Sequence, residues 1–135
     1  MNKFHHIGIF VKDLDYGRSE MSKFIQVSQE SEIIIDENLG VKILFLRDQE
    51  NINYELVAPY GKNNPVDGVI SREKDLLNHI AYVSDSFDEE IKVLRRNGFV
   101  PLGKPKKAKA FKDARVIFFL NPLGFIIEII EDLEK

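Results

Sequence analysis

The chain contains an internal repeat. HIGIFVKDLD, which begins at His6, aligns without a gap with HIAYVSDSFD, which begins at His79, so the two segments lie 73 residues apart. The same offset places Glu55, in NINYELV, on Glu128, in LGFIIEII, and it places ILF at 43–45 on VIF at 116–118. A repeat with constant internal spacing predicts two copies of one supersecondary unit.

The first copy is expected to fold as β-α-β-β-β. Apolar alternation predicts a strand over about 4–11, and Asp13 or Asp15 can cap a helix over about 15–26. Three further strands are predicted from β-branched and aromatic runs bounded by turn residues, at 33–36, 41–47 and 53–59.

The second copy repeats this order. A strand is predicted over about 78–83, then a helix that begins at Ser86 or Asp88 and ends at Asn97-Gly98, a pair that tolerates the left-handed conformation. Three more strands are predicted, near 99 and over 115–120 and 125–130. The expected fold class is therefore α+β, built from two tandem β-α-β-β-β modules.

A turn-rich segment separates the modules. PYGKNNPVDG, which begins at Pro59, suits an exposed connection, so we expect module one over about 1–59, a linker over about 60–75 and module two over about 76–135. Neither half, of about 60 residues, has obvious means to bury both faces of a four-stranded sheet. The prediction is one domain over 1–135, with the modules paired within one chain or exchanged between two chains of a possible homodimer.

Four residues stand out because the repeat couples them. A single histidine in a strand is more often a packing residue, and a single glutamate more often faces solvent. His6, Glu55, His79 and Glu128, however, recur as a His-Glu pair in both copies. Strand parity puts His6 on one face with Gly8, and the competing ligand His5 on the other face with Ile7. It also gives each histidine a small neighbour, Gly8 or Ala81, where a ligand can approach.

Two imidazoles and two carboxylates suit one divalent metal ion. Neutral nitrogens and anionic oxygens match Zn²⁺, Co²⁺, Ni²⁺, Mn²⁺ or Fe²⁺ and leave open positions for water or substrate. The chain has no cysteine, so thiol catalysis, disulfides and Cys-based metal sites are excluded.

Charge is unevenly distributed. Six of the 19 basic residues lie between Lys104 and Arg115, and the rest of the chain carries 13 basic and 21 acidic residues. This acidic body argues against nucleic-acid binding, whereas the basic segment is either a solvated loop or a site for an anionic small molecule. The candidate substrate-binding residues are Lys104, Lys106, Lys107, Lys109 and Arg115. Without a signal peptide or a long apolar run, we expect a cytoplasmic protein with no membrane partner.

The motifs resemble those of the vicinal oxygen chelate (glyoxalase, bleomycin-resistance and dioxygenase) superfamily. FHHIGIFVKDLD is similar to the opening of methylmalonyl-CoA epimerases, and NYELVAP, NHIAYVSD and NPLGFIIEII resemble the segments that carry the other ligands. The resemblance covers essentially the whole chain. It implies a cupped mixed sheet around a central site, with His6, Glu55, His79 and Glu128 as metal ligands.

The resemblance also implies an activity. A metal-dependent epimerase or isomerase would enolise an acyl-CoA-like thioester next to its carbonyl, with Glu128 as the first candidate base and Glu55 the second. The alternatives are a lyase of the lactoylglutathione lyase (glyoxalase I) type and a non-catalytic small-molecule binding or resistance protein. Phe10 stands where bacterial glyoxalase I enzymes tend to have an arginine that serves glutathione, which argues against a glutathione substrate. Extradiol dioxygenases use two histidines and only one carboxylate, which argues against dioxygenase chemistry in this chain.

Overall fold

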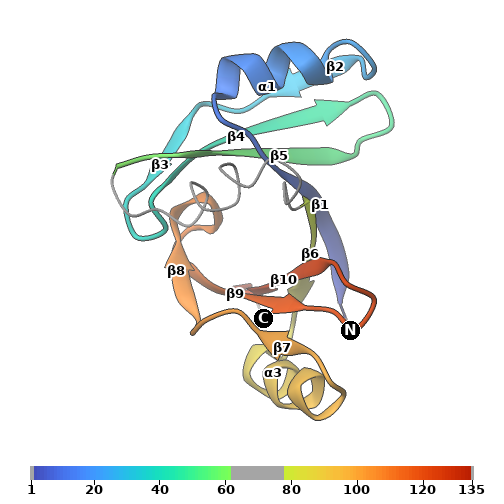
Figure 1. Cartoon of the computed structure of the whole chain (residues 1–135), viewed down its shortest axis with the longest axis vertical. Coiled ribbons are helices and arrows are strands. Elements are labelled where there is room, and N and C mark those ends of the chain that lie inside the picture. The colour runs from blue at the N-terminus through green and yellow to red at the C-terminus, as the bar shows by residue number, and fades with distance from the viewer. Residues whose placement is uncertain (1, 62–77, 135) are drawn as a thin grey trace.

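In the part of the chain that the structure describes, the fold is a mixed ten-stranded sheet with two α-helices on its outer face (Figure 1). The computed structural model describes residues 2–61 and 78–134. In chain order the elements are β1 (Lys3–Phe10), α1 (Leu14–Met21), β2 (Val27–Glu30), β3 (Ile34–Asp36), β4 (Val41–Asp48), β5 (Asn53–Pro59), β6 (Asn78–Ser84), α3 (Phe87–Arg96), β7 (Val100–Pro101), β8 (Lys106–Ala108), the 3₁₀ turn η1 (Lys109–Phe111), β9 (Ala114–Leu120) and β10 (Ile126–Glu131). The predicted α+β class is confirmed. The predicted linker over about 60–75 lies mostly outside the described residues.

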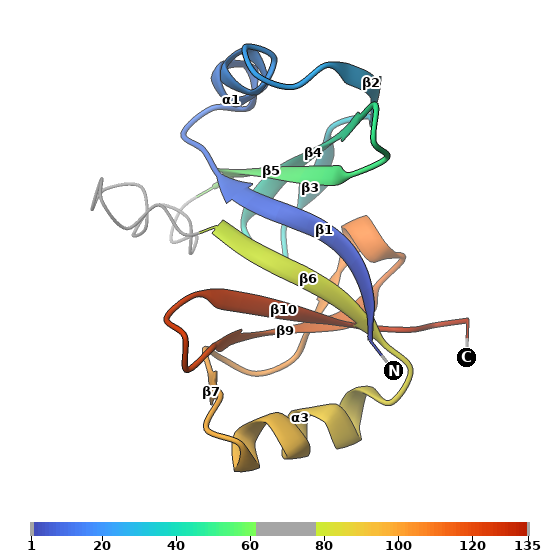
Figure 2. The ribbon, with the colours of Figure 1, turned by 90° about the vertical axis from the view of Figure 1, so that its right-hand side faces the viewer.

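The strand order places the two copies of the repeat side by side. The path through the sheet is β2-β4-β5-β1-β6-β10-β9-β7, with β3 also on β4 and β8 also on β9. β1 and β6 are antiparallel neighbours at the centre of the sheet (Figure 2). β5 lies on the other side of β1 and runs parallel to it, and β10 lies on the other side of β6 and runs parallel to it. The first strands of both modules therefore meet, and each brings its histidine to the middle of the sheet.

Two strands were not predicted. In each copy the outer strand is interrupted, so β2 and β3 both pair with β4, and β7 and β8 both pair with β9. β2 is VSQE and β8 is KKA, and neither shows apolar alternation because both lie largely exposed at the sheet's edge. Part of the predicted basic loop is thus a short strand.

The first helix is shorter than predicted. Asp13 is its N-cap, with Oδ1 accepting hydrogen bonds from the backbone N–H groups of Asp15 and Tyr16. The helix ends at Met21 instead of about 26, because Ile25 turns back to pack on the core and β2 begins at Val27. The second helix agrees with its prediction, since Asn97 caps it and Gly98 follows at φ 90°.

Side-chain parity separates two faces of the curved sheet. On β5, Leu56 and Ala58 belong to the core cluster that includes Leu14 and Met21 of α1. On β10, Ile127 and Ile129 pack with Phe87 of α3 in the same way. The alternate residues of β5 and β10 face the inner, concave side, and these include Glu55 and Glu128. None of the helices in the described residues is long and apolar enough to span a membrane.

Candidate metal centre

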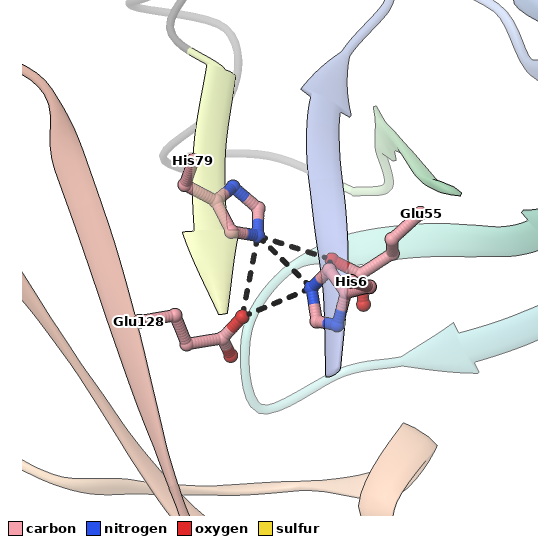
Figure 3. Close-up of side chains that lie close together, drawn as sticks. All are labelled: His6, Glu55, His79 and Glu128. Carbon is pink, nitrogen blue, oxygen red and sulfur yellow. Dashed lines mark hydrogen bonds and ion pairs between the residues drawn. The ribbon is translucent and has the colours of Figure 1, made fainter. Parts of the chain in front are cut away.

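The structure brings the four repeated residues together. His6 lies on β1, Glu55 on β5, His79 on β6 and Glu128 on β10, which are four adjacent strands of the sheet. Their side chains point toward one another on the concave face (Figure 3). One potential ligand atom from each residue lies within 4.8 Å of all the others, and all four residues are buried.

The distances between these atoms suit ligands of a single ion. The two imidazole Nε2 atoms are 3.2 Å apart. His6 Nε2 is 3.3 Å from Glu55 Oε1 and 3.3 Å from Glu128 Oε1, and His79 Nε2 is 3.4 and 3.2 Å from the same two oxygens. Donors about 2.1 Å from a common metal ion would be about 3.0–3.4 Å apart when adjacent.

One buried oxygen also fits a bound cation. Glu128 Oε1 is fully buried and has no hydrogen-bond partner, although it lies at ion-pair distance from both imidazoles. A buried carboxylate oxygen without a hydrogen bond is unfavourable in a protein interior. A divalent ion held by two nitrogens and two carboxylates would satisfy it, so the residues present fit a metal ion.

The pKa values of the four side chains show that the site favours positive charge. Burial lowers the pKa of His6, but its close ion-pair contacts with the carboxylates of Glu128 and Glu55 outweigh burial and raise this pKa to about 9. The pKa of His79 is also raised, against burial, by the same two carboxylates. Burial raises the pKa of Glu55, but the imidazoles hold it down at about 2 and also lower that of Glu128. Both carboxylates are therefore ionised at neutral pH.

Small residues make room for the imidazoles. In the β1·β6 ladder His6 lies opposite Ala81, and His79 lies opposite Gly8. A Cβ on residue 8 would overlap the imidazole ring of His79. Gly8 and Ala81 were predicted to leave space for an approaching ligand; at Gly8 the space holds the histidine of the other module instead.

His5 supports His6, an arrangement that parity reasoning missed. The β1·β6 register shifts between Phe4 and His6, so His5 is an extra, bulged residue and does not simply face away with Ile7. His5 Nδ1 lies 2.8 Å from His6 Nδ1. If His6 Nε2 binds a metal ion, His6 Nδ1 must carry the ring proton, and its N–H donates a hydrogen bond to His5 Nδ1. Burial and the neighbouring His6 charge lower the pKa of His5, which favours the neutral acceptor form.

A cavity of about 290 Å³ leads to the centre. Glu55, His79 and Glu128 line it, whereas His6 lies behind them and is fully buried. Two of the predicted substrate-binding residues, Lys104 and Lys106, also line this cavity, and both are exposed. A substrate in the cavity would therefore approach the centre on the side of Glu55, His79 and Glu128.

The other three predicted substrate-binding residues do not line the cavity. Lys107 pairs with Arg115 in the β8·β9 ladder, at the parity opposite to Lys106. Lys109 uses its backbone N–H to donate to Asp36 Oδ2, at 2.8 Å. The Arg115 guanidinium binds Asp88 and Glu131, with Nη2–O distances of 3.0 and 2.7 Å.

Aromatic residues around the centre were not singled out from the sequence. Phe45 is the register partner of Glu55, and Phe118 is that of Glu128. Phe45 and Phe118 also correspond in the repeat, through ILF and VIF. Phe111 stacks on His6 at 5.8 Å between ring centroids. The repeat itself was the signal that could have identified the first two.

Comparison with known structures identifies similar folds. A hypothetical protein from Bacillus halodurans C-125 is 25% identical, with a TM-score of 0.74 over 99% of this chain and 96% of that one. Methylmalonyl-CoA epimerase from Mycobacterium tuberculosis is 19% identical, with a TM-score of 0.75 over 95% and 86%. A variant of the Streptomyces coelicolor epimerase in complex with 2-nitronate-propionyl-CoA is 19% identical, with a TM-score of 0.73 over 98% and 99%.

Sequence comparison defines the family. No curated protein sequence matches the chain. A family model described as the Glyoxalase/Bleomycin resistance protein/Dioxygenase superfamily matches residues 5–118, which include His6, Glu55 and His79. This match covers most of the 135 residues and agrees with the fold of the structural neighbours. The chain therefore belongs to the glyoxalase, bleomycin resistance protein and dioxygenase superfamily.

Proposed function

We propose that this protein is a metal-dependent enzyme that removes the proton next to a substrate carbonyl, as an epimerase or isomerase of an acyl-CoA-like thioester. The observation that carries the proposal is the convergence of His6, Glu55, His79 and Glu128 at the inner end of a cavity. The epimerase structures named above support the choice of reaction, since one of them holds a propionyl-CoA analogue.

The four side chains would hold the ion, and the ion would supply Lewis-acid chemistry. A divalent ion held there would supply Lewis-acid stabilisation of the enolate that forms when the proton next to the carbonyl leaves. His6, behind the other three ligands, fixes the rear of the site. The apolar residues around the cavity exclude water from the reacting carbon.

Glu128 is the proposed base, with Glu55 as the second candidate. Both carboxylates have lowered pKa values and line the cavity, so each is available as a base toward a substrate held there. Glu128 comes first because the resemblance to epimerases gives the proton-transfer role to the carboxylate on the last strand.

The positions of the carboxylates suit epimerisation. β5 and β10 lie on opposite sides of the β1·β6 pair, so Glu55 and Glu128 approach the imidazoles from different modules. One carboxylate can take a proton from one face of the substrate carbon while the other returns a proton to the opposite face. Isomerisation would instead return the proton to the adjacent carbon.

The cavity mouth suits the anionic end of a thioester. Lys104 and Lys106 are exposed and border the cavity. Their ammonium groups can meet the phosphates of a coenzyme A moiety that extends into solvent. Lys107, Lys109 and Arg115 would contribute only if the phosphates reached past the mouth.

Exchange of the substrate α-proton with solvent deuterium tests the proposal. Zn²⁺- or Co²⁺-loaded protein is incubated in D₂O with methylmalonyl-CoA and with 2-methylbutyryl-CoA, and deuterium uptake is followed by mass spectrometry. We expect metal-dependent exchange with at least one thioester, lost in Glu128→Gln with metal retained. Exchange at the wild-type rate in that variant would contradict the role of Glu128.

Two parallel assays separate the alternative functions. Loss of a hemithioacetal of glutathione in the presence of Ni²⁺ or Zn²⁺ would indicate a lyase of the glyoxalase I type. Stoichiometric metal binding without turnover in either assay would favour a non-catalytic binding protein, for which the apolar cavity is also suited.

A further inference from the structure

The inner part of the cavity is lined by apolar side chains. The buried residues that form its walls come from both modules: Val41, Ile43, Val57, Ala108, Val116 and Ile126. None of these side chains can donate or accept a hydrogen bond. A substrate group that enters beside the metal centre would therefore meet hydrocarbon on the walls contributed by both halves of the sheet.

This apolar surface begins directly at a metal ligand. The ring of Phe10 lies 5.7 Å from the ring of His79, and the ring of Phe118 lies 5.4 Å from it at an interplanar angle of 89°. Both phenylalanines line the cavity. An acyl group that lies beside His79 in the cavity would therefore meet these two aromatic rings.

Charge in the cavity is divided between its two ends. Among the described residues that line it, the charged side chains are Glu55 and Glu128 at the inner end and Lys104 and Lys106, both exposed, at the mouth. The two glutamates would already neutralise the charge of a divalent ion held there. A free carboxylate on the reacting carbon of the substrate would add an uncompensated negative charge against apolar walls, which is costly.

We propose that the substrate is a thioester whose acyl group is apolar, an alkyl or aryl group on the reacting carbon, and not a dicarboxylic acyl group such as malonyl. This inference rests on the proposed function and specifies its substrate class. The anionic part of the substrate would lie at the mouth, with the lysines. A cavity of about 290 Å³ leaves room for an acyl group larger than propionyl.

Hydroxamates that chelate metal ions test this specificity without turnover. Zn²⁺-loaded protein is titrated by calorimetry with acetohydroxamate, propionohydroxamate, butyrohydroxamate and hexanohydroxamate, and with malonomonohydroxamate as the carboxylate counterpart of propionohydroxamate. We expect affinity to rise by up to about fourfold for each added methylene until the cavity is full. We also expect propionohydroxamate to bind at least tenfold more tightly than malonomonohydroxamate.

Two variants locate the effect in the cavity. Val116→Phe and Val57→Phe fill it from different modules, and each should abolish the gain with chain length while binding of acetohydroxamate is retained. Two variants are used so that misfolding of one does not end the test. The hydroxamate titrations of the wild-type protein test the inference even if neither variant folds.

Opposite results would overturn the inference. Hydroxamate affinity that does not change with chain length, or binding of malonomonohydroxamate that is tighter than that of propionohydroxamate, contradicts an apolar acyl group. The proposed function is not contradicted by these results as long as the protein binds Zn²⁺. Failure of Zn²⁺ to bind at all contradicts the proposed function first, and the inference fails with it.

Discussion

Gly8 lies opposite His79 in the β1·β6 ladder, and the imidazole of His79 fills the space that a side chain on residue 8 would need. The corresponding pair, Ala81 and His6, lies two positions along the same ladder. Each module thus supplies a histidine and the small residue that accommodates the histidine of the other module. The candidate metal centre depends on this close pairing of two strands.

Replacing Gly8 with alanine should displace His79. The new Cβ would overlap the imidazole, so the ring must turn away from Glu55 and Glu128. We expect Zn²⁺ affinity to fall by at least about 100-fold, measured by competition with a chelator of known affinity. Ala81→Gly is the matched control, since it removes atoms beside His6 and should retain tight binding. Equal affinities of Gly8→Ala and wild type would show that His79 is not required.

Removing the hydrogen-bond acceptor on His5 should weaken the site through His6. His5→Phe keeps a ring beside Phe111, whose ring centroid lies 5.2 Å from that of His5. The phenyl ring cannot accept the hydrogen bond that His6 Nδ1 donates to His5. We expect metal affinity to fall by about 10–100-fold. His5→Asn places an amide oxygen near the former Nδ1 and should restore part of it.

The tautomer of His6 distinguishes this role from a structural one. In the Zn²⁺-loaded wild-type protein, ¹⁵N NMR should show His6 protonated at Nδ1 and its Nδ1 proton protected from solvent exchange. In His5→Phe that proton should exchange faster although the fold is unchanged. Identical exchange in the two proteins would rule out the contact with His5 as the cause.

Metal affinity should rise with pH up to about 9. The pKa of His6 is raised to about 9, so His6 is protonated at neutral pH in the metal-free protein, and the raised pKa of His79 keeps a proton on that imidazole to a higher pH than usual. A metal ion must displace them, whereas Glu55 and Glu128 have lowered pKa values and release none. We expect apparent affinity to increase by about tenfold or more per pH unit between pH 7 and 9.

Calorimetry measures this proton release directly. Titration of Zn²⁺ in two buffers of different ionisation enthalpy should show one to two protons released per ion at pH 7.5. Release of no proton would mean that the metal ion does not bind at the imidazoles.

Asp36 should be important for stability and not for chemistry. It is fully buried, and its carboxylate accepts hydrogen bonds from the backbone N–H groups of Leu39, at 3.1 Å, and Lys109, at 2.8 Å. The second bond joins the modules, next to the turn that carries Phe111. Asp36→Ala should lower the free energy of unfolding by about 3 kcal/mol, because both N–H groups lose their partners. Urea denaturation checks this, with Glu37→Ala, an exposed neighbour, expected to change stability little.

The repeat was sufficient to predict the four central residues. Because His6 and His79 share one spacing to Glu55 and Glu128, any fold that pairs the two copies symmetrically brings them together, and apolar alternation located most strands. Strand parity also chose His6 over His5 for the centre. These predictions depended on local periodicity and on symmetry, both of which can be seen in a single sequence.

Other features depend on contacts that local patterns do not encode. The bulge that turns His5 toward His6 arises from the pairing of β1 with β6, which are far apart in the chain. β8 is a strand only because Lys106 and Ala108 pair with β9, and that pairing decides that Lys106 lines the cavity while Lys107 does not. Arg115 was grouped with the lysines by proximity in sequence, but its partners Asp88 and Glu131 come from other elements.

Metal content is the most direct test of the central claim, that His6, Glu55, His79 and Glu128 form one metal site. Purified protein is supplemented with Zn²⁺, Co²⁺, Ni²⁺, Mn²⁺ or Fe²⁺, freed of excess metal, and analysed by elemental mass spectrometry beside His79→Ala. We expect one ion per chain in the wild-type protein with at least one of these metals, and less than a tenth of that in the variant. Substoichiometric metal in the wild type, or undiminished metal in His79→Ala, would contradict the account.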